Sequence, residues 1–171
     1  EVIVPAVRAR VPQARFVVAS KDPITNPAAG RLRGVELLPS TDLRLLFHDC
    51  AVGAAPLHAG FEVRGSVLEA MAAGIPVVTT ERVREHLGAT ADFELRVGDT
   101  AAGFARHIVE LLVSSSDREA VGASGRRFVR ANFSWEVFGA RLDTLLTGAA
   151  KGPSTATEGS GPRPIPAAFG G

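Results

Sequence analysis

The first half of the chain alternates between stretches with helix-like spacing of apolar residues and short, continuous apolar runs. Residues 2–10 have helix-compatible spacing, and a Val-Pro-Gln break separates them from a β-branched run at residues 15–19. Such a run is typical of a strand buried in a parallel sheet. Further short runs at residues 35–38 and 51–56 predict two more strands. The pattern therefore predicts a helix followed by three strands.

Turn-forming residues and one short helix separate these strands. Residues 20–33 are rich in Pro, Asn and Gly, which predicts a loop or at most a short helix. Residues 40–42, Ser-Thr-Asp, offer side chains that cap a helix, and the apolar residues at 43–47 follow them. A short amphipathic helix is expected there.

The stretch at residues 58–80 predicts a glycine-bearing loop, a short helix, a Gly-Ile-Pro turn and an apolar strand. Ser66 and Glu69 have the capping-box spacing, in which each side chain accepts a hydrogen bond from a backbone N–H at the helix start. The helix is therefore expected to begin at Ser66. The amides of residues 65–68 would then include unpaired donors, and the helix dipole favours an anion beside them. Phosphate is the typical ligand of such a site.

The second half of the chain is predicted to be mainly helical. A helical turn at residues 82–87 ends at Gly88, and a brief strand at 93–97 follows. Asp99-Thr100 cap a helix with apolar residues at 104, 108, 111 and 112, and another helix covers about 117–131. Ser134 caps the last helix, whose apolar residues are Trp135, Phe138, Leu142, Leu145 and Leu146.

These elements define one folded domain and a tail. Strands that alternate with helices predict the α/β class, with a doubly wound, mostly parallel sheet and helices on both faces. The domain is expected to span residues 1–147, truncated at its N-terminus because the chain starts within a helix-like stretch. Residues 148–171 are rich in Gly, Pro, Ser and Ala, so this tail is predicted to be disordered. In such sheets ligands bind at the carboxyl ends of the strands, where the loop at 57–65 lies.

Composition and charge add few constraints. The 171 residues, 46% of them hydrophobic, can bury a sizeable core, and the net charge of +1 predicts neither nucleic acid nor an anionic membrane as partner. Cys50 is the single cysteine, so a buried free thiol in a reducing compartment is expected. The sequence has no apolar run of membrane-spanning length, no Cys/His cluster with metal-ligand spacing, no phosphate-binding G-x4-G-K-[ST] loop and no G-x-S-x-G motif.

The sequence GSVLEAMAAGIPVVTT at residues 65–80 resembles the donor-site segment of retaining glycosyltransferases of the two-domain GT-B type, the group-1 family. VPQARFVVAS resembles the helix end and strand before that family's nucleotide loop. GVELLPSTDLRLLFHDCAVGAAPL resembles its strand, helix and strand that lead into the donor loop. RRFVRANFSWEVFGARLDTLL resembles its closing Phe-Ser-Trp helix. The resemblance covers about residues 5–146 and implies a Rossmann-like fold.

The resemblance implies an enzyme that transfers a sugar from a nucleotide diphosphate sugar to an acceptor hydroxyl. The family's ribose-binding glutamate corresponds to Glu69, and its diphosphate-binding helix amides correspond to Gly65, Ser66 and Val67. Oriented backbone N–H groups can stabilise charge on the leaving diphosphate. Neither a metal nor another cofactor is implied.

Two positions depart from the family pattern. The family's first glutamate, which touches the donor sugar, would fall at Phe61, with Glu62 one residue later as the candidate catalytic residue. In members with a Gly-x-Arg-x-Lys loop the lysine would fall at Ser66, so Arg64 is the candidate for the charge that faces the phosphates.

The resemblance also implies what lies outside this chain. The family's first strand of this domain and its acceptor-binding domain have no counterpart here, so the acceptor, a glycan, lipid or small molecule, is expected to bind to a missing N-terminal domain. The fragment alone is expected to transfer no sugar. The expected location is cytoplasmic, which is compatible with peripheral association at the inner face of the membrane.

Other interpretations remain open at this stage. Glu69 and Ser66 could form only a capping box, and Arg64 could be a solvated loop charge. His58 and His86 are isolated histidines, for which a structural role is more common than a catalytic one. The chain could be a non-catalytic Rossmann-like binding or scaffold module with a degraded donor site, or a flavodoxin-like binding domain.

Overall fold

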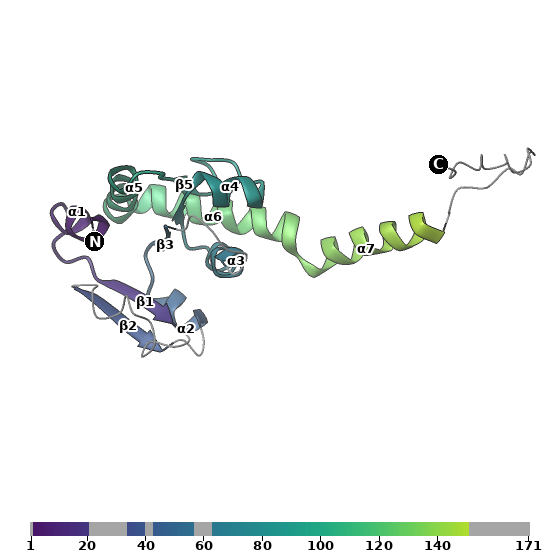
Figure 1. Ribbon diagram of the computed structural model, residues 1–171, viewed down its shortest axis with the longest axis horizontal. Helices are drawn as coiled ribbons and strands as arrows, with labels where there is room; N and C mark the ends of the chain where they lie inside the picture. The colour runs from purple at the N-terminus through teal and green to yellow at the C-terminus, as the bar shows by residue number, and fades with distance from the viewer. Residues whose placement is uncertain (1, 21–33, 40–42, 57–62, 151–171) are drawn as a thin grey trace, which may run out of the picture. The chain divides into compact units, whose positions relative to one another are not determined.

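The computed structural model of the chain describes residues 2–20, 34–39, 43–56 and 63–150 (Figure 1). The chain forms two compact units, Glu1–Ser134 and Trp135–Gly171. The first contains every described strand, and the second contributes one described helix.

The first unit begins with a helix and a parallel pair of strands. Helix α1 (Ile3–Arg8) leads into β1 (Phe16–Ser20), which pairs in parallel with β2 (Val35–Pro39). In this register Phe16 lies opposite Val35. The bounds of these two predicted strands are thus confirmed to within one residue, but the burial predicted for the first is wrong, because Val17 and Val18 of β1 are exposed. The loop predicted at residues 20–33 lies mostly outside the described residues.

A second parallel sheet has the strand order β3-β4-β5. Its strands are β3 (Gly53–Ala55), β4 (Val77–Thr79) and β5 (Arg96–Val97). Helix α3 (Val63–Ala73) carries the chain from β3 to β4, which a parallel pair requires because the chain must return to the start of the sheet. Helix α2 (Leu43–His48) precedes β3. The predicted short helix is confirmed, although residues 40–42, its expected cap, lie outside the described residues.

The remaining helices of this unit begin and end as their local sequences predict. Helix α4 (Glu81–Leu87) ends at Gly88, whose φ of 69° is left-handed and favours glycine. Helix α5 (Ala101–Val113) begins at Thr100, whose hydroxyl accepts a hydrogen bond from the Gly103 amide. Helix α6 (Ser115–Phe133) is capped in the same way by Ser114. Strand β5 is shorter than predicted, because residues 92–94 form a turn instead of continuing the ladder.

The core confirms the doubly wound α/β class. Successive strand residues point to opposite faces of a sheet, and Val77 and Val78 of β4 enter different apolar clusters. One cluster joins α3, α4 and α6 through residues that include Met71, and the other joins α1 and α5 through residues that include Phe104. Helices therefore cover both faces of the second sheet.

The described part of the second unit is one helix, α7 (Trp135–Ala150). Its aromatic and leucine side chains are exposed, and the rings of Trp135 and Phe138 meet edge to face with centroids 5.9 Å apart. The helix continues three residues beyond Thr147, where the body was expected to end. Residues 151–171, the rest of the predicted tail, lie outside the described residues. No helix in the described ranges is long and apolar enough to cross a membrane.

Candidate functional site

The candidate site lies at the carboxyl edge of the second sheet. Because β3, β4 and β5 are parallel, their carboxyl ends meet at one edge, which is where open α/β sheets bind ligands. The chain leaves this edge after Ala55 toward α3, after Thr79 toward α4, and after Val97 toward α5. The segment between β3 and α3, which includes His58, Phe61 and Glu62, lies outside the described residues.

Helix α3 starts earlier than the sequence predicts. It begins at Val63, so the predicted start at Ser66 is wrong, and the capping box between Ser66 and Glu69 is wrong with it. Ser66 is the fourth helical residue and cannot be the N-cap. A Ser-x-x-Glu spacing also occurs inside a helix, where the two residues lie one turn apart on its surface. Gly65 lies within the helix, which continues to Ala73.

The earlier start moves the free amides toward the N-terminus. Beyond the first turn of a helix each amide donates to the carbonyl four residues back, so the amides at the described start of α3 are the ones that helix geometry favours for a ligand. These belong to Val63, Arg64 and Gly65. Of the three residues predicted to contact a diphosphate through their amides, Gly65 is the best placed. The contacts predicted for Ser66 and Val67 remain predictions.

The side chains of α3 divide between the core and the surface. Val67, Ala70 and Met71 are buried, while Gly65, Ser66 and Glu69 are exposed. Glu69 follows Gly65 by four residues, so the two lie one turn apart on the same exposed face. The predicted side-chain ligand and the best-placed amide thus share one face, and Val67 contributes to the core.

Thr79 lies at the centre of the carboxyl edge. Its side chain is fully buried, and its hydroxyl donates to the Ala55 carbonyl at 3.1 Å. Its own carbonyl accepts from the Gly98 amide at 2.8 Å. Thr80 is also buried. Burial of their side chains argues against direct contact with a ligand in this structure.

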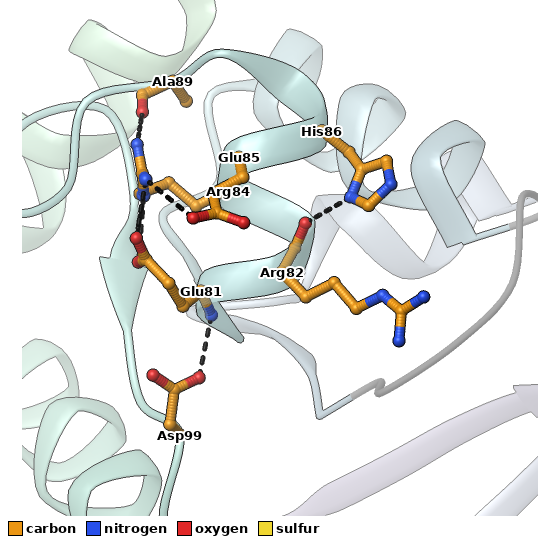
Figure 2. Close-up of polar contacts among 7 residues, drawn as sticks. All are labelled: Glu81, Arg82, Arg84, Glu85, His86, Ala89 and Asp99. Carbon is orange, nitrogen blue, oxygen red and sulfur yellow. Dashed lines mark hydrogen bonds and ion pairs between the residues drawn. The ribbon is translucent and has the colours of Figure 1, made fainter.

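Asp99 contacts a different element from the one predicted. The sequence places it beside Thr100 as a cap of α5, and Thr100 does supply that cap. The Asp99 carboxylate instead accepts from the Glu81 amide at 2.9 Å and so binds the start of α4 (Figure 2). No local signal predicts this contact, because 18 residues separate the partners.

An ion pair stabilises α4 next to this contact. The Arg84 guanidinium donates to the Glu81 carboxylate, with a shortest distance of 2.6 Å, and to the Ala89 carbonyl at 3.0 Å (Figure 2). The hydrogen bond to Glu81 raises the pKa of Arg84. His86 bonds through Nδ1 to the Arg82 carbonyl of the preceding turn, which supports the structural interpretation of this histidine.

Metal-binding clusters are not found in the described ranges. No group of three or more His, Cys, Asp or Glu side chains there could hold a metal ion. Cys50 is half-buried, and its thiol donates to the Val52 carbonyl at 3.2 Å. Burial raises the pKa of this thiol, which keeps it in its neutral and less nucleophilic form.

Comparison with known proteins adds two findings. Residues 1–114 match the model of the family described as "Glycosyl transferases group 1". The chain is also 33% identical over 96 residues to a GDP-mannose-dependent monoacylated alpha-(1-6)-phosphatidylinositol monomannoside mannosyltransferase of Corynebacterium glutamicum. That match covers 51% of this chain and 24% of the relative, so the chain spans about a quarter of the relative's length.

Proposed function

Since this chain belongs to the group 1 glycosyl transferases, we propose that it supplies the donor-binding half of a two-domain GT-B enzyme. The proposed reaction transfers a sugar from a nucleotide diphosphate sugar to an acceptor hydroxyl. A mannosyltransferase among the relatives supports a hexosyl donor. The acceptor would bind to a domain outside this chain, and the proposed setting is the cytoplasm, including the inner face of the membrane.

The observation that carries this proposal is the exposed face of α3. Gly65 and Glu69 lie one turn apart, about 6 Å along the helix axis. The amides of the first turn, together with the helix dipole, favour the diphosphate of the donor. The Glu69 carboxylate, one turn further along, can accept hydrogen bonds from the ribose hydroxyls. One helix thus offers groups for both parts of a nucleoside diphosphate.

The remaining roles follow from the chemistry of the leaving group. Backbone N–H groups already oriented toward the diphosphate stabilise its charge as the sugar departs. Arg64 is proposed to add a positive charge beside the phosphates, and Glu62 to contact the donor sugar. The proposal requires neither a metal ion nor another cofactor.

Nucleotide titration tests the proposal directly. Calorimetric titration of the chain with GDP, UDP and ADP should show weak binding of at least one at millimolar concentration. Glu69→Ala should weaken that binding about tenfold, because the carboxylate makes charge-assisted hydrogen bonds. Glu119→Ala, which removes an exposed carboxylate from α6, is the matched control and should bind as the wild type does.

Absence of binding by all three nucleotides would contradict an intact site. The chain alone should also transfer no sugar, since the acceptor would bind elsewhere. The alternative function, a non-catalytic scaffold with a degraded site, is favoured by Phe61 and Ser66 at positions where the family has a glutamate and a lysine. In a longer protein that contains both domains, unchanged sugar transfer by Glu69→Ala would refute the role of Glu69.

A further inference from the structure

One buried residue, Thr79, joins the ends of the three strands in the second sheet, through its side chain on one side and its backbone carbonyl on the other. Thr79 is the last residue of β4 and lies opposite Ala55, the last residue of β3. Its hydroxyl bonds to the carbonyl of Ala55, and its carbonyl bonds to the amide of Gly98, just after β5. A side chain therefore supplements the backbone ladder at the edge where the site lies.

The bond to Ala55 matters because the chain leaves the sheet at that residue. Strand β3 ends there, and the chain then passes to α3. This carbonyl lies where the ladder between β3 and β4 ends, and a buried carbonyl is stabilised by the hydrogen bonds that it accepts. The Thr79 hydroxyl satisfies it and fixes the peptide from which the chain departs. Helix α3 also packs on β3 and β4, so its position depends on this edge.

A second bond at the same edge offers an internal comparison. The Asp99 carboxylate holds the Glu81 amide at the start of α4, which Thr80 does not cap with its own side chain. This bond joins the end of β5 to α4 and does not involve β3 or α3. Loss of either bond should lower the stability of the edge. Only the bond from Thr79 involves β3, the strand that precedes α3 in the chain.

We propose that Thr79 is a positioning residue for nucleotide binding: its hydroxyl fixes the end of β3 and thereby the orientation of the first turn of α3. Thr79 does not touch the ligand, because its side chain is fully buried. The inference rests on the proposed donor-binding role of α3. It adds a residue that acts through the backbone to the residues proposed to contact the donor.

Three variants of the whole chain test this role. Thr79→Val keeps the shape and removes the hydroxyl, Thr79→Ser keeps the hydroxyl, and Asp99→Ala removes the other bond. Each is titrated with GDP, UDP and ADP below its melting temperature, and amide hydrogen exchange is measured along α3. Thr79→Val should raise Kd about three- to tenfold, the effect of one hydrogen bond, and speed exchange in α3. Thr79→Ser should retain wild-type values, and Asp99→Ala should lower Tm without changing Kd.

Several outcomes would overturn the role of Thr79. It fails if Thr79→Val lowers Tm but leaves Kd and exchange in α3 at wild-type values. It also fails if Thr79→Ser binds as weakly as Thr79→Val, since the hydroxyl would then be irrelevant. If the wild type binds none of the nucleotides, the proposed function fails separately. Amide hydrogen exchange along α3 still decides whether Thr79 orders this helix. Unchanged exchange in Thr79→Val would show that it does not.

Discussion

The packing of α6 on the turn between α3 and β4 leads to a sharp prediction for Gly122. This residue is buried, and a Cβ built on it would lie 2.1 Å from the Gly74 carbonyl oxygen and 3.5 Å from Pro76 Cδ. The nearest atom belongs to the backbone of a turn, and Gly74 itself has a left-handed φ of 83°. Such a turn cannot move aside as a flexible side chain can. Gly122→Ala must therefore push α6 away from the turn.

The magnitude follows from two opposing effects. Alanine is favoured over glycine inside a helix by about 0.5–1 kcal/mol. Overpacking of a close contact typically costs about 1–3 kcal/mol and occasionally more. A separation of 2.1 Å lies far below van der Waals contact, so the upper part of that range applies. We expect the free energy of unfolding to fall by about 1–2 kcal/mol and Tm by about 3–10 °C.

The assay is urea unfolding followed by circular dichroism, with Gly65→Ala as the matched control. Gly65 is also a helical glycine, but a Cβ there meets nothing within 4 Å. The control should leave stability unchanged or raise it by about 0.5–1 kcal/mol. If Gly122→Ala were as stable as the wild type or more stable, α6 could not pack on the Gly74 turn as the structure shows.

Two further predictions concern the core and the cysteine. Met71→Ala should lower the free energy of unfolding by about 2–5 kcal/mol in urea unfolding, because Met71 of α3 is fully buried against α6. Met71→Leu should cost less than about 1.5 kcal/mol, and equal effects of the two substitutions would exclude a cavity as the cause. Burial raises the pKa of the Cys50 thiol above 9.0 in the folded state. The contribution of the protonated thiol to folding stability is therefore complete below pH 9.0 and is lost as the pH rises through the folded pKa. A disulfide reagent at pH 8 should therefore modify Cys50 more slowly in the native chain than in urea, and equal rates would contradict this.

The sequence predicts the order and type of most elements because each depends on local patterns. The β-branched run of β1, the αL glycine after α4 and the hydroxyl cap of α5 all act over a few residues. The start of α3 was predicted wrongly for the same reason: Ser66 and Glu69 have the spacing of a cap, but they also fit the second turn of a helix. The start of α3 at Val63 decides between a helix cap and a position inside the helix. The spacing of Ser66 and Glu69 does not specify where the helix starts.

The long-range bonds at the carboxyl edge of the second sheet could not be predicted in this way. Thr79 reaches Ala55 across 24 positions, and Asp99 reaches Glu81 across 18. Either residue, taken by itself, fits a common local role: a strand-end threonine, or a cap for the next helix. Only the sheet register places each beside its partner. Sequence therefore predicts which edge of the sheet a ligand is expected to approach, but it does not predict the contacts that order that edge.

The same distinction explains why the motif at residues 65–80 identifies the family more strongly than it identifies a site. Val67, Met71 and Val77 of this motif are buried in the core, and Gly74 forms the turn beneath α6. These residues would be needed for the fold whether or not a donor binds. Glu69 is exposed and contributes nothing to the core, so the donor-binding hypothesis depends on it most directly. Substitutions at the buried positions should change stability first, and substitution of Glu69 should change nucleotide binding alone.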